Sequence, residues 1–385
     1  RGTFRDFTRY FVGSTVHFKR VFDIYDINNI LLVGFDNSYQ DGSILFYELD
    51  SNANRSTQLR TNKKEGALTY GIFLQNEILW NNLSVILGLR YDNVTYHTQN
   101  FLLFSSSDEK KFEKIIPKIG ISLRLLDNFS VFSNFGGGIE VPAGNETDPI
   151  PGEDTVFQIN PLLNPIFSKT YEFGFKSFFI IDKLIKSIEF EGSLFKIDTE
   201  NELIPYRQGK FYLSASRTSR LGLEWMLRTI LPFGIKFNAS FSYLIGKFDD
   251  YMVDSAHYDK SKSGVYANFK GNYLPGVPKY HYYTSVIIPL IADFEFSVYG
   301  VSKYFCDDAN KIEVPSYNLF NFRLLYNKIT IGEKLNLSLS FCVNNLLDTK
   351  YIGSSFLNPI YEKGEGIFNE NSKIYLQINF SLWDY

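Results

Sequence analysis

The sequence predicts an all-β fold, an antiparallel transmembrane β-barrel with about 15 strands. Two observations predict it: a dyad of apolar and polar residues that recurs at one length, and connections that alternate between short and long. Side chains of a strand point alternately to its two faces, so the dyad gives one apolar and one polar face. Strands of about 9–11 residues with such faces are typical of membrane barrels.

The dyad is clearest in four stretches, at residues 83–91, 235–243, 334–343 and 372–382. In the last of them Ile374 and Leu376 fall on one face, and Tyr375 and Gln377 fall on the other. A polar face of this kind is too hydrophilic for a packed core and suits a water-filled lumen.

Period-two patterns bounded by turn residues predict the strands in chain order. They cover residues 8–21, 30–39, 67–79, 83–96, 114–125, 130–137, 169–180, 185–197, 218–230, 235–247, 279–288, 294–304, 316–326, 334–344 and 372–382. No helical periodicity persists, and no run of about 18 apolar residues predicts a membrane-spanning helix.

The connections between these strands alternate in length. The short ones are residues 22–29, 80–82, 126–128, 181–184, 231–234, 289–293 and 327–333. The long ones are residues 40–66, 97–113, 138–168, 198–217, 248–278, 305–315 and 345–371. Outer-membrane barrels have short periplasmic turns and long external loops. If the last strand ends at the periplasm, the first begins outside. Because such barrels have even strand numbers, we expect residues 1–385 to be the C-terminal portion of one barrel domain, incomplete at its N-terminus.

Composition narrows the function classes. The net charge of −3 argues against a nucleic-acid partner, and the 17% of aromatic residues suits a membrane interface. Cys306 and Cys342 fit no metal spacing and are interpreted as unrelated thiols, with a disulfide as the alternative. The four histidines share no metal-ligand spacing, and no nucleophile has an oriented base, so we expect neither a metal site nor an enzyme.

Several motifs resemble those of the TonB-dependent outer-membrane receptors, of the siderophore or ferric-chelate type. The hairpin 76–92 ends in Gly88-Leu-Arg-Tyr-Asp92, and Asn160–Lys176 is similar to a second family segment. Shorter matches lie at residues 220–224, 274–278 and 343–351. The chain departs from the family at Phe167, where Pro-Glu is usual, and at Leu382, where a terminal Phe is usual.

This resemblance implies a barrel of about 22 strands, of which about 15 are present, with its plug domain absent from this chain. It implies a place in the outer membrane of a diderm bacterium and energised uptake of an iron chelate, such as a siderophore or ferric citrate. The implied partners are the TonB complex, through the missing N-terminal plug, the ferric chelate, and lipopolysaccharide or outer-membrane lipid. The chelate is the transported ligand, and no cofactor is expected. A passive porin or channel and a surface-exposed adhesin remain as alternatives.

Candidate ligand contacts are basic and tyrosine side chains in the long connections. Arg binds carboxylates through two parallel hydrogen bonds, and Tyr adds an aromatic surface with a hydroxyl group. The alternative is that these residues are solvated or meet lipopolysaccharide. The candidates are Arg55, Arg60, Tyr206, Arg207, Lys210, Tyr212, Tyr258 and Lys260.

Three further charged residues, Arg90, Glu172 and Glu224, lie on predicted lumen faces. There they would either face the plug or remain as hydrated charges of the wall. The acidic connection 138–168 contains no His, which by the resemblance disfavours haem as the ligand. Its carboxylates could bind Ca²⁺, but their spacing matches no calcium-loop signature.

Overall fold

The structure is a computed structural model. It describes residues 3–102, 106–142, 159, 164–181, 185–206, 211–254, 266–331, 335–355, 357–358, 367–370 and 373–382.

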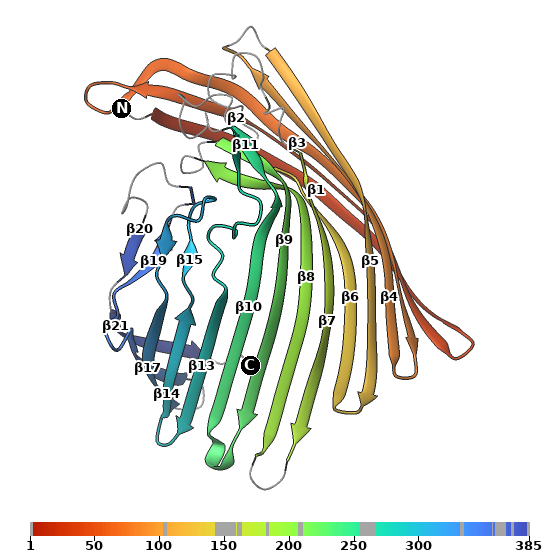
Figure 1. The fold of residues 1–385 in the computed structure, drawn as a ribbon, viewed down its shortest axis with the longest axis vertical. Coiled ribbons are helices and arrows are strands. Elements are labelled where there is room, and N and C mark those ends of the chain that lie inside the picture. Colours follow the sequence, from red (N-terminus) through yellow and green to blue (C-terminus); the bar gives the residue numbers. More distant parts are fainter. Residues whose placement is uncertain are drawn as a thin grey trace. The chain divides into compact units, whose positions relative to one another are not determined.

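Fifteen strands form one antiparallel sheet whose spatial order follows the chain (Figure 1). They are β1 (Thr3–Ile24), β2 (Ile27–Leu49), β3 (Arg55–Trp80), β4 (Leu83–Asn100), β5 (Ser106–Leu126), β6 (Phe129–Glu140), β7 (Ile166–Ile180), β8 (Ser187–Tyr206), β9 (Phe211–Ile230), β10 (Lys236–Asp250), β13 (Tyr280–Pro289), β14 (Asp293–Val301), β17 (Tyr317–Ile331), β18 (Leu335–Asn344) and β21 (Lys373–Leu382). Each predicted stretch corresponds to one of these strands, so the predicted strand content and order are confirmed.

Short elements lie in the connections. Three small sheets pair β11 (Met252–Asp254) with β12 (Tyr266–Asn268), β15 (Tyr304–Phe305) with β16 (Glu313–Val314), and β19 (Tyr351–Ser355) with β20 (Ile367–Glu370). A 3₁₀ turn, η1 (Pro232–Gly234), joins β9 to β10. Among the residues described above, no helix is long and apolar enough to cross a membrane.

The chain divides into two compact units. Unit 1 comprises residues 1–122, 134–171 and 198–217, and unit 2 comprises residues 123–133, 172–197 and 218–385. Strands β5 to β9 contribute residues to both units, and each unit is described separately below. The expectation of a single domain over residues 1–385 stays a prediction.

Several predicted loops are wrong in extent, because the strands continue into them. Gln40 pairs with Ala67 and Phe46 pairs with Thr61, so the connection 40–66 is mostly strand and its turn is short. The ends of β4, β5, β8 and β9 likewise occupy parts of 97–113 and 198–217. The hydrogen bonds between strands pair backbone groups and do not depend on whether the side chains are apolar, so a strand can continue beyond its apolar face. The alternating pattern in the sequence marks only the part of the strand that has an apolar face.

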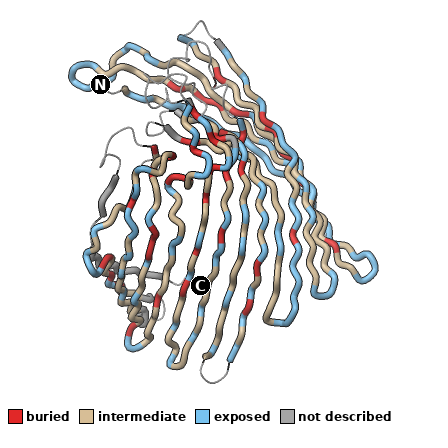
Figure 2. The backbone as a smooth tube through the Cα atoms, viewed as in Figure 1, coloured by how far each residue is buried: buried red, intermediate tan, exposed pale blue. Residues whose placement is uncertain are grey.

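The register confirms the predicted faces. In unit 1, Val33 is opposite Leu74, which is opposite Leu89, and Ile72 and Leu89 on this face are each 52% exposed. In unit 2, Phe241 is opposite Tyr282, whereas Asn238 is opposite Ser285 on the other face. Most strand residues are half-buried or exposed in each unit (Figure 2), as expected for strands without a packed core on their polar face.

Buried apolar side chains gather instead where the connections of unit 2 fold together. We call this group the loop core; it comprises Phe248, Tyr251, Phe269, Leu274, Cys306, Asp308, Val314 and Asn358. Cys306 and Cys342 are both buried free thiols. The interpretation as unrelated thiols is therefore confirmed, and the alternative of a disulfide is wrong.

Candidate functional site

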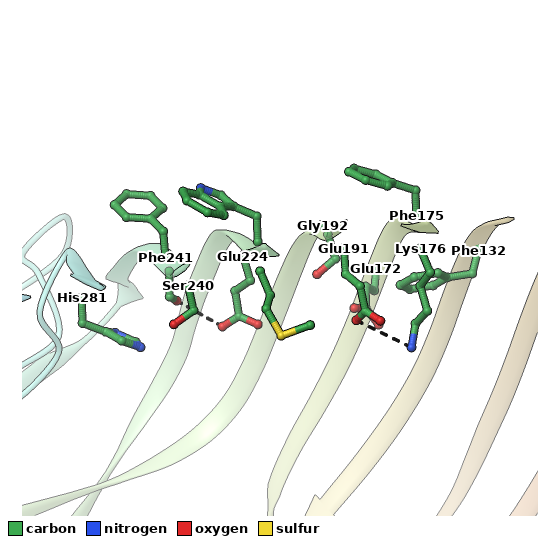
Figure 3. A pocket seen from close by; sticks show the side chains of 14 residues that line it. Phe132, Glu172, Phe175, Lys176, Glu191, Gly192, Glu224, Ser240, Phe241 and His281 are labelled. Atoms are coloured by element: carbon green, nitrogen blue, oxygen red, sulfur yellow. Dashed lines mark hydrogen bonds and ion pairs between the residues drawn. The ribbon is translucent and has the colours of Figure 1, made fainter. Parts of the chain in front are cut away.

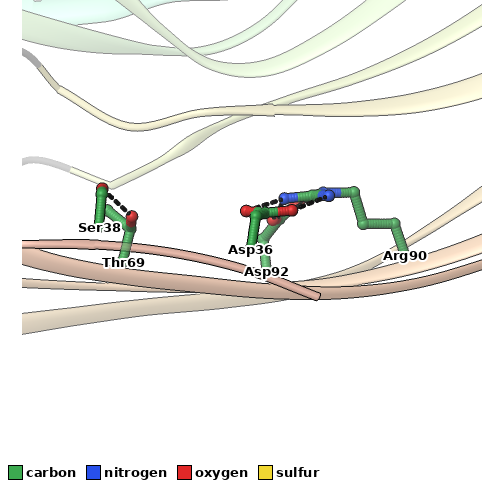
Figure 4. A network of polar contacts seen from close by, with 5 residues as sticks. All are labelled: Asp36, Ser38, Thr69, Arg90 and Asp92. Atoms are coloured by element: carbon green, nitrogen blue, oxygen red, sulfur yellow. Dashed lines mark hydrogen bonds and ion pairs between the residues drawn. The ribbon is translucent and has the colours of Figure 1, made fainter. Parts of the chain in front are cut away.

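On the polar face of unit 1, Arg90 of β4 joins its own strand to β2 (Figure 4). Its Nη1 and Nη2 donate to the two carboxylate oxygens of Asp36 at 2.8 and 3.0 Å, and its Nε donates to Asp92 at 2.8 Å. The guanidinium crosses β3 at Gly71, where an added Cβ would clash with Arg90 Nη2. Glycine therefore makes room for a cross-strand network in which two carboxylates share one cation.

A second polar region of unit 1 is a recess of about 710 Å³ bordered by Gln75, Gly88, Lys118 and Asn134. Lys118 is exposed and lies beside Gly88, with 3.5 Å between its Cβ and the position of a Cβ on Gly88. The recess thus combines a cation with amide groups that can donate and accept hydrogen bonds.

Unit 2 has a recess of about 410 Å³ whose charged lining is Glu172, Lys176, Glu191 and Glu224. Lys176 Nζ lies 3.9 Å from Glu191, and Ser242 Oγ donates to Glu224 at 3.1 Å. Figure 3 shows these carboxylates on one side of the strands, and the rings of Phe175 and Phe241 on the other side. The lining holds three carboxylates and one ammonium group, so this recess is acidic.

Within the part of the chain that the structure describes, no group of three or more His, Cys, Asp or Glu residues is placed to hold a metal ion.

The two arginines of the predicted ligand set lie on the β2–β3 hairpin, and both are already paired. Arg60 Nε donates to Glu48 at 2.8 Å. Arg55 Nη1 lies 3.8 Å from Asp6, and its Cζ lies 3.7 Å from the ring centroid of Tyr47. The charge of Arg60 is therefore compensated within the hairpin by Glu48, and that of Arg55 by Asp6 of the neighbouring strand β1.

The remaining loop candidates are placed only in part. Tyr212 is a half-buried residue of β9 that has interaction partners, and of Tyr206 only the backbone at the end of β8 is described. Arg207, Lys210, Tyr258 and Lys260 lie outside the described residues. The role of each in ligand binding stays a prediction.

Sequence reasoning missed Asp41, which is buried where the extended ends of β1 to β4 meet. Its carboxylate accepts hydrogen bonds from Tyr10 and Tyr39 at 3.0 and 2.9 Å, and Lys64 Nζ lies 2.5 Å away. Burial alone would raise the pKa of Asp41, but these partners outweigh it and lower the pKa to about 2. An Asp-Gly pair in a predicted loop gave no signal of this role, because such a pair usually indicates a turn.

The second missed group is Asp308 of the loop core. Its carboxylate accepts hydrogen bonds from the Tyr251 hydroxyl at 3.2 Å and from Asn358 Nδ2 at 3.1 Å. Asn358 Oδ1 also accepts the backbone N–H of Asp308 at 2.9 Å. These contacts tie three connections together, with Tyr251 57 residues and Asn358 50 residues from Asp308 in the sequence. Periodicity gives no signal across such separations.

Known proteins share this architecture. The family described as TonB dependent receptor-like, beta-barrel matches residues 1–346. The ferrichrome outer membrane transporter/phage receptor of Escherichia coli (strain K12) is 22% identical over 300 residues, which is 74% of this chain and 35% of that protein.

Two solved structures have closely similar folds. The ferric citrate transporter FecA in its unliganded form superposes with a TM-score of 0.79 and 17% identity, covering 99% of this chain and 55% of that one. The siderophore receptor PiuA from Acinetobacter baumannii gives a TM-score of 0.75 and 16% identity, covering 98% and 56%. The chain thus spans about a third of the length of the curated relative and about half of each solved structure.

Proposed function

The chain belongs to the TonB-dependent receptor-like β-barrel family, and from this premise we propose that it is the barrel portion of a receptor for energised uptake of an iron chelate. It is an antiparallel β-barrel protein of the Gram-negative outer membrane. The substrate that we propose is a siderophore or ferric citrate.

The observation that carries the proposal is the family match over residues 1–346 together with the two faces of the sheet. One face exposes large apolar side chains such as Ile72 and Leu89, and the opposite face carries charged networks and recesses. Such a division suits a wall between lipid and a water-filled path. Lys118 in one recess and Glu224 in the other offer weak polar contacts to a chelate that must enter and leave.

The proposed partners follow from the same premise. TonB would act through a plug domain of the whole protein, with Arg90, Glu172 and Glu224 on the polar face that such a plug would meet. The chelate is cargo, and we infer that the protein neither converts it chemically nor holds a resident cofactor. The lipid partner is lipopolysaccharide or another outer-membrane lipid.

Two other functions are distinguished by their energy dependence and their substrates. A passive porin would admit small solutes without an energy source, whereas an adhesin on the same scaffold would carry no iron. The family match favours gated transport over both.

Radiolabelled-iron uptake in a deletion strain tests this proposal. The probes are a panel of ferric chelates that includes ferric citrate and ferrichrome, and we expect deletion to abolish accumulation from at least one of them. Restoring the full-length gene should restore uptake, and a protonophore should remove it again. Unchanged accumulation from every chelate would contradict the proposal, and protonophore-resistant uptake would favour the porin.

A further inference from the structure

The apolar face of unit 2 ends in tyrosines on the side of the long connections. Ring centroids of Trp225, Phe241 and Tyr280 follow one another at 6.0 and 6.3 Å across β9, β10 and β13. Tyr243 is opposite Tyr280, one step nearer the connection 248–278 than Phe241, and both tyrosines are partly exposed. Tyrosine settles where hydrocarbon meets the polar headgroups, so this pair marks the edge of the lipid-facing surface.

Two lysines lie just beyond that edge and converge on one ring. Lys247 follows Tyr243 by four residues on β10 and therefore lies on the same face. It forms an isolated bridge with Tyr273, which places the two side chains on one side. Lys247 Nζ lies 5.1 Å and Lys279 Nζ 4.2 Å from the centroid of the Tyr273 ring.

Tyr273 is held firmly between them. Its backbone N–H donates to Asn310 Oδ1 at 2.7 Å, and its carbonyl accepts from Asn310 Nδ2 at 2.9 Å. Its ring stacks on Phe305 with 6.4 Å between centroids. Because the Tyr273 backbone is hydrogen-bonded and one side of its ring is packed, the ring has a defined position. The two ammonium groups that contact the ring therefore lie near one point.

No carboxylate among the described residues compensates the positive charge at this point. Among the described residues, neither Lys247 nor Lys279 forms an ion pair with a carboxylate. The hydrogen bond from Lys279, with the charge of Lys247 in addition, lowers the pKa of the Tyr273 phenol. Asp249, the acidic residue two positions from Lys247, instead accepts a hydrogen bond from Ser219 Oγ at 2.9 Å.

We infer that Lys247, Lys279 and the Tyr273 hydroxyl bind the phosphate group of a membrane-lipid headgroup. Two ammonium groups and a hydroxyl donor match the charge and the acceptor oxygens of a phosphate. Tyr243 and Tyr280, at the adjoining edge of the lipid-facing surface, would contact the start of the acyl chains. The site therefore suits a lipid headgroup better than a free phosphate ion. The inference rests on the apolar face lying in lipid, and it is independent of which chelate is transported.

Lipid binding to the purified full-length protein in detergent tests the site. The probes are lipid A, the same lipid after dephosphorylation, and inorganic phosphate, each titrated and read by native mass spectrometry. We expect the Lys247→Gln/Lys279→Gln double variant to bind lipid A about 25-fold more weakly, because each lysine near a membrane surface contributes about a factor of five. Lys247→Arg/Lys279→Arg, which keeps both charges, should retain most of the affinity.

Lys270→Gln is the matched control, because Lys270 is an exposed lysine of the same connection that lies outside the cluster. It should bind lipid A like the unmodified protein. Equal binding of dephosphorylated lipid, or undiminished binding by the double variant, would overturn the inference. Inorganic phosphate that binds as tightly as lipid A would overturn the assignment to a lipid. Chelate uptake by the double variant should stay normal. Failure of the lipid-site inference would therefore appear in lipid A binding, whereas failure of the transport proposal would appear in chelate uptake.

Discussion

Removing Arg90 should destabilise unit 1 more than removing any solvated arginine. In Arg90→Met the carboxylates of Asp36 and Asp92 lose their shared cation while the aliphatic bulk of the side chain remains. Hydrogen bonds to charged groups contribute about 1.5–3 kcal/mol each when buried, and exposed ion pairs contribute about 0.2–1 kcal/mol. The Arg90 and Asp36 side chains are about one-third exposed, so we expect a total loss of about 2 kcal/mol.

Unfolding of the full-length protein in detergent by guanidinium chloride, followed at equilibrium, measures this loss of unfolding free energy. Arg9→Met is the control, because Arg9 is an exposed residue of β1, and its replacement should change the unfolding free energy by less than about 0.5 kcal/mol. Adding Asp36→Asn to Arg90→Met should recover about 1 kcal/mol, since it removes the repulsion between two unpaired carboxylates. A loss in Arg90→Met no larger than that of the control would refute the reasoning.

Three further predictions concern the hairpin, the extended strand ends and the loop core. Arg55→Ala and Arg60→Ala should leave ferric citrate and ferrichrome binding to the full-length protein within about twofold, because both guanidinium groups are already paired; a loss above tenfold in a tyrosine-fluorescence titration would contradict this. Lowering the pH from about 4 to 2 should reduce the protection of β1–β4 against hydrogen exchange, measured relative to the intrinsic exchange rate at each pH, because the folded pKa of Asp41 lies near 2, below its ordinary 3.8, and its stabilisation is lost as the carboxylate takes up a proton; Asp41→Asn should abolish this loss of protection, and unchanged protection in the unmodified protein would disprove it. Asn358→Ala should destabilise the loop core by about 2 kcal/mol, since it leaves the buried Asp308 carboxylate short of a donor; limited proteolysis no faster than in the unmodified protein would argue against that role.

The strand order of this fold is predictable from the sequence because lipid contact imposes a simple pattern. Leu87 and Leu89 face one way and Arg90 faces the other, as the dyad requires. The pattern ends at the edge of the apolar surface, but the ladder continues, so the sequence alone placed a loop where Gln40 in fact pairs with Ala67. Strand extension there depends on cross-strand partners such as Lys64, whose position no local pattern reveals.

The candidate site was less predictable for a physical reason. Charge type identified Arg55 and Arg60, but the pairing that neutralises them depends on the registers of β1 with β2 and of β2 with β3. Asp308 and Asn358 meet only after two distant connections have folded together, and neither residue stands in a recognisable motif. A sequence therefore shows which chemical groups a chain contains. Whether each group is already paired within the protein can be determined only from the fold.

A spin-label scan of residues 83–91 in the full-length protein, reconstituted in lipid bilayers, tests the central claim most directly. One label at a time would replace each residue, and collision rates with oxygen and with a water-soluble nickel complex would be measured. Oxygen access should peak at positions 85, 87 and 89, and nickel access should peak at 84, 86, 88 and 90, so that the two profiles alternate with period two and opposite phase. Profiles that rise and fall together, or that show no alternation, would contradict a wall with lipid on one face and water on the other.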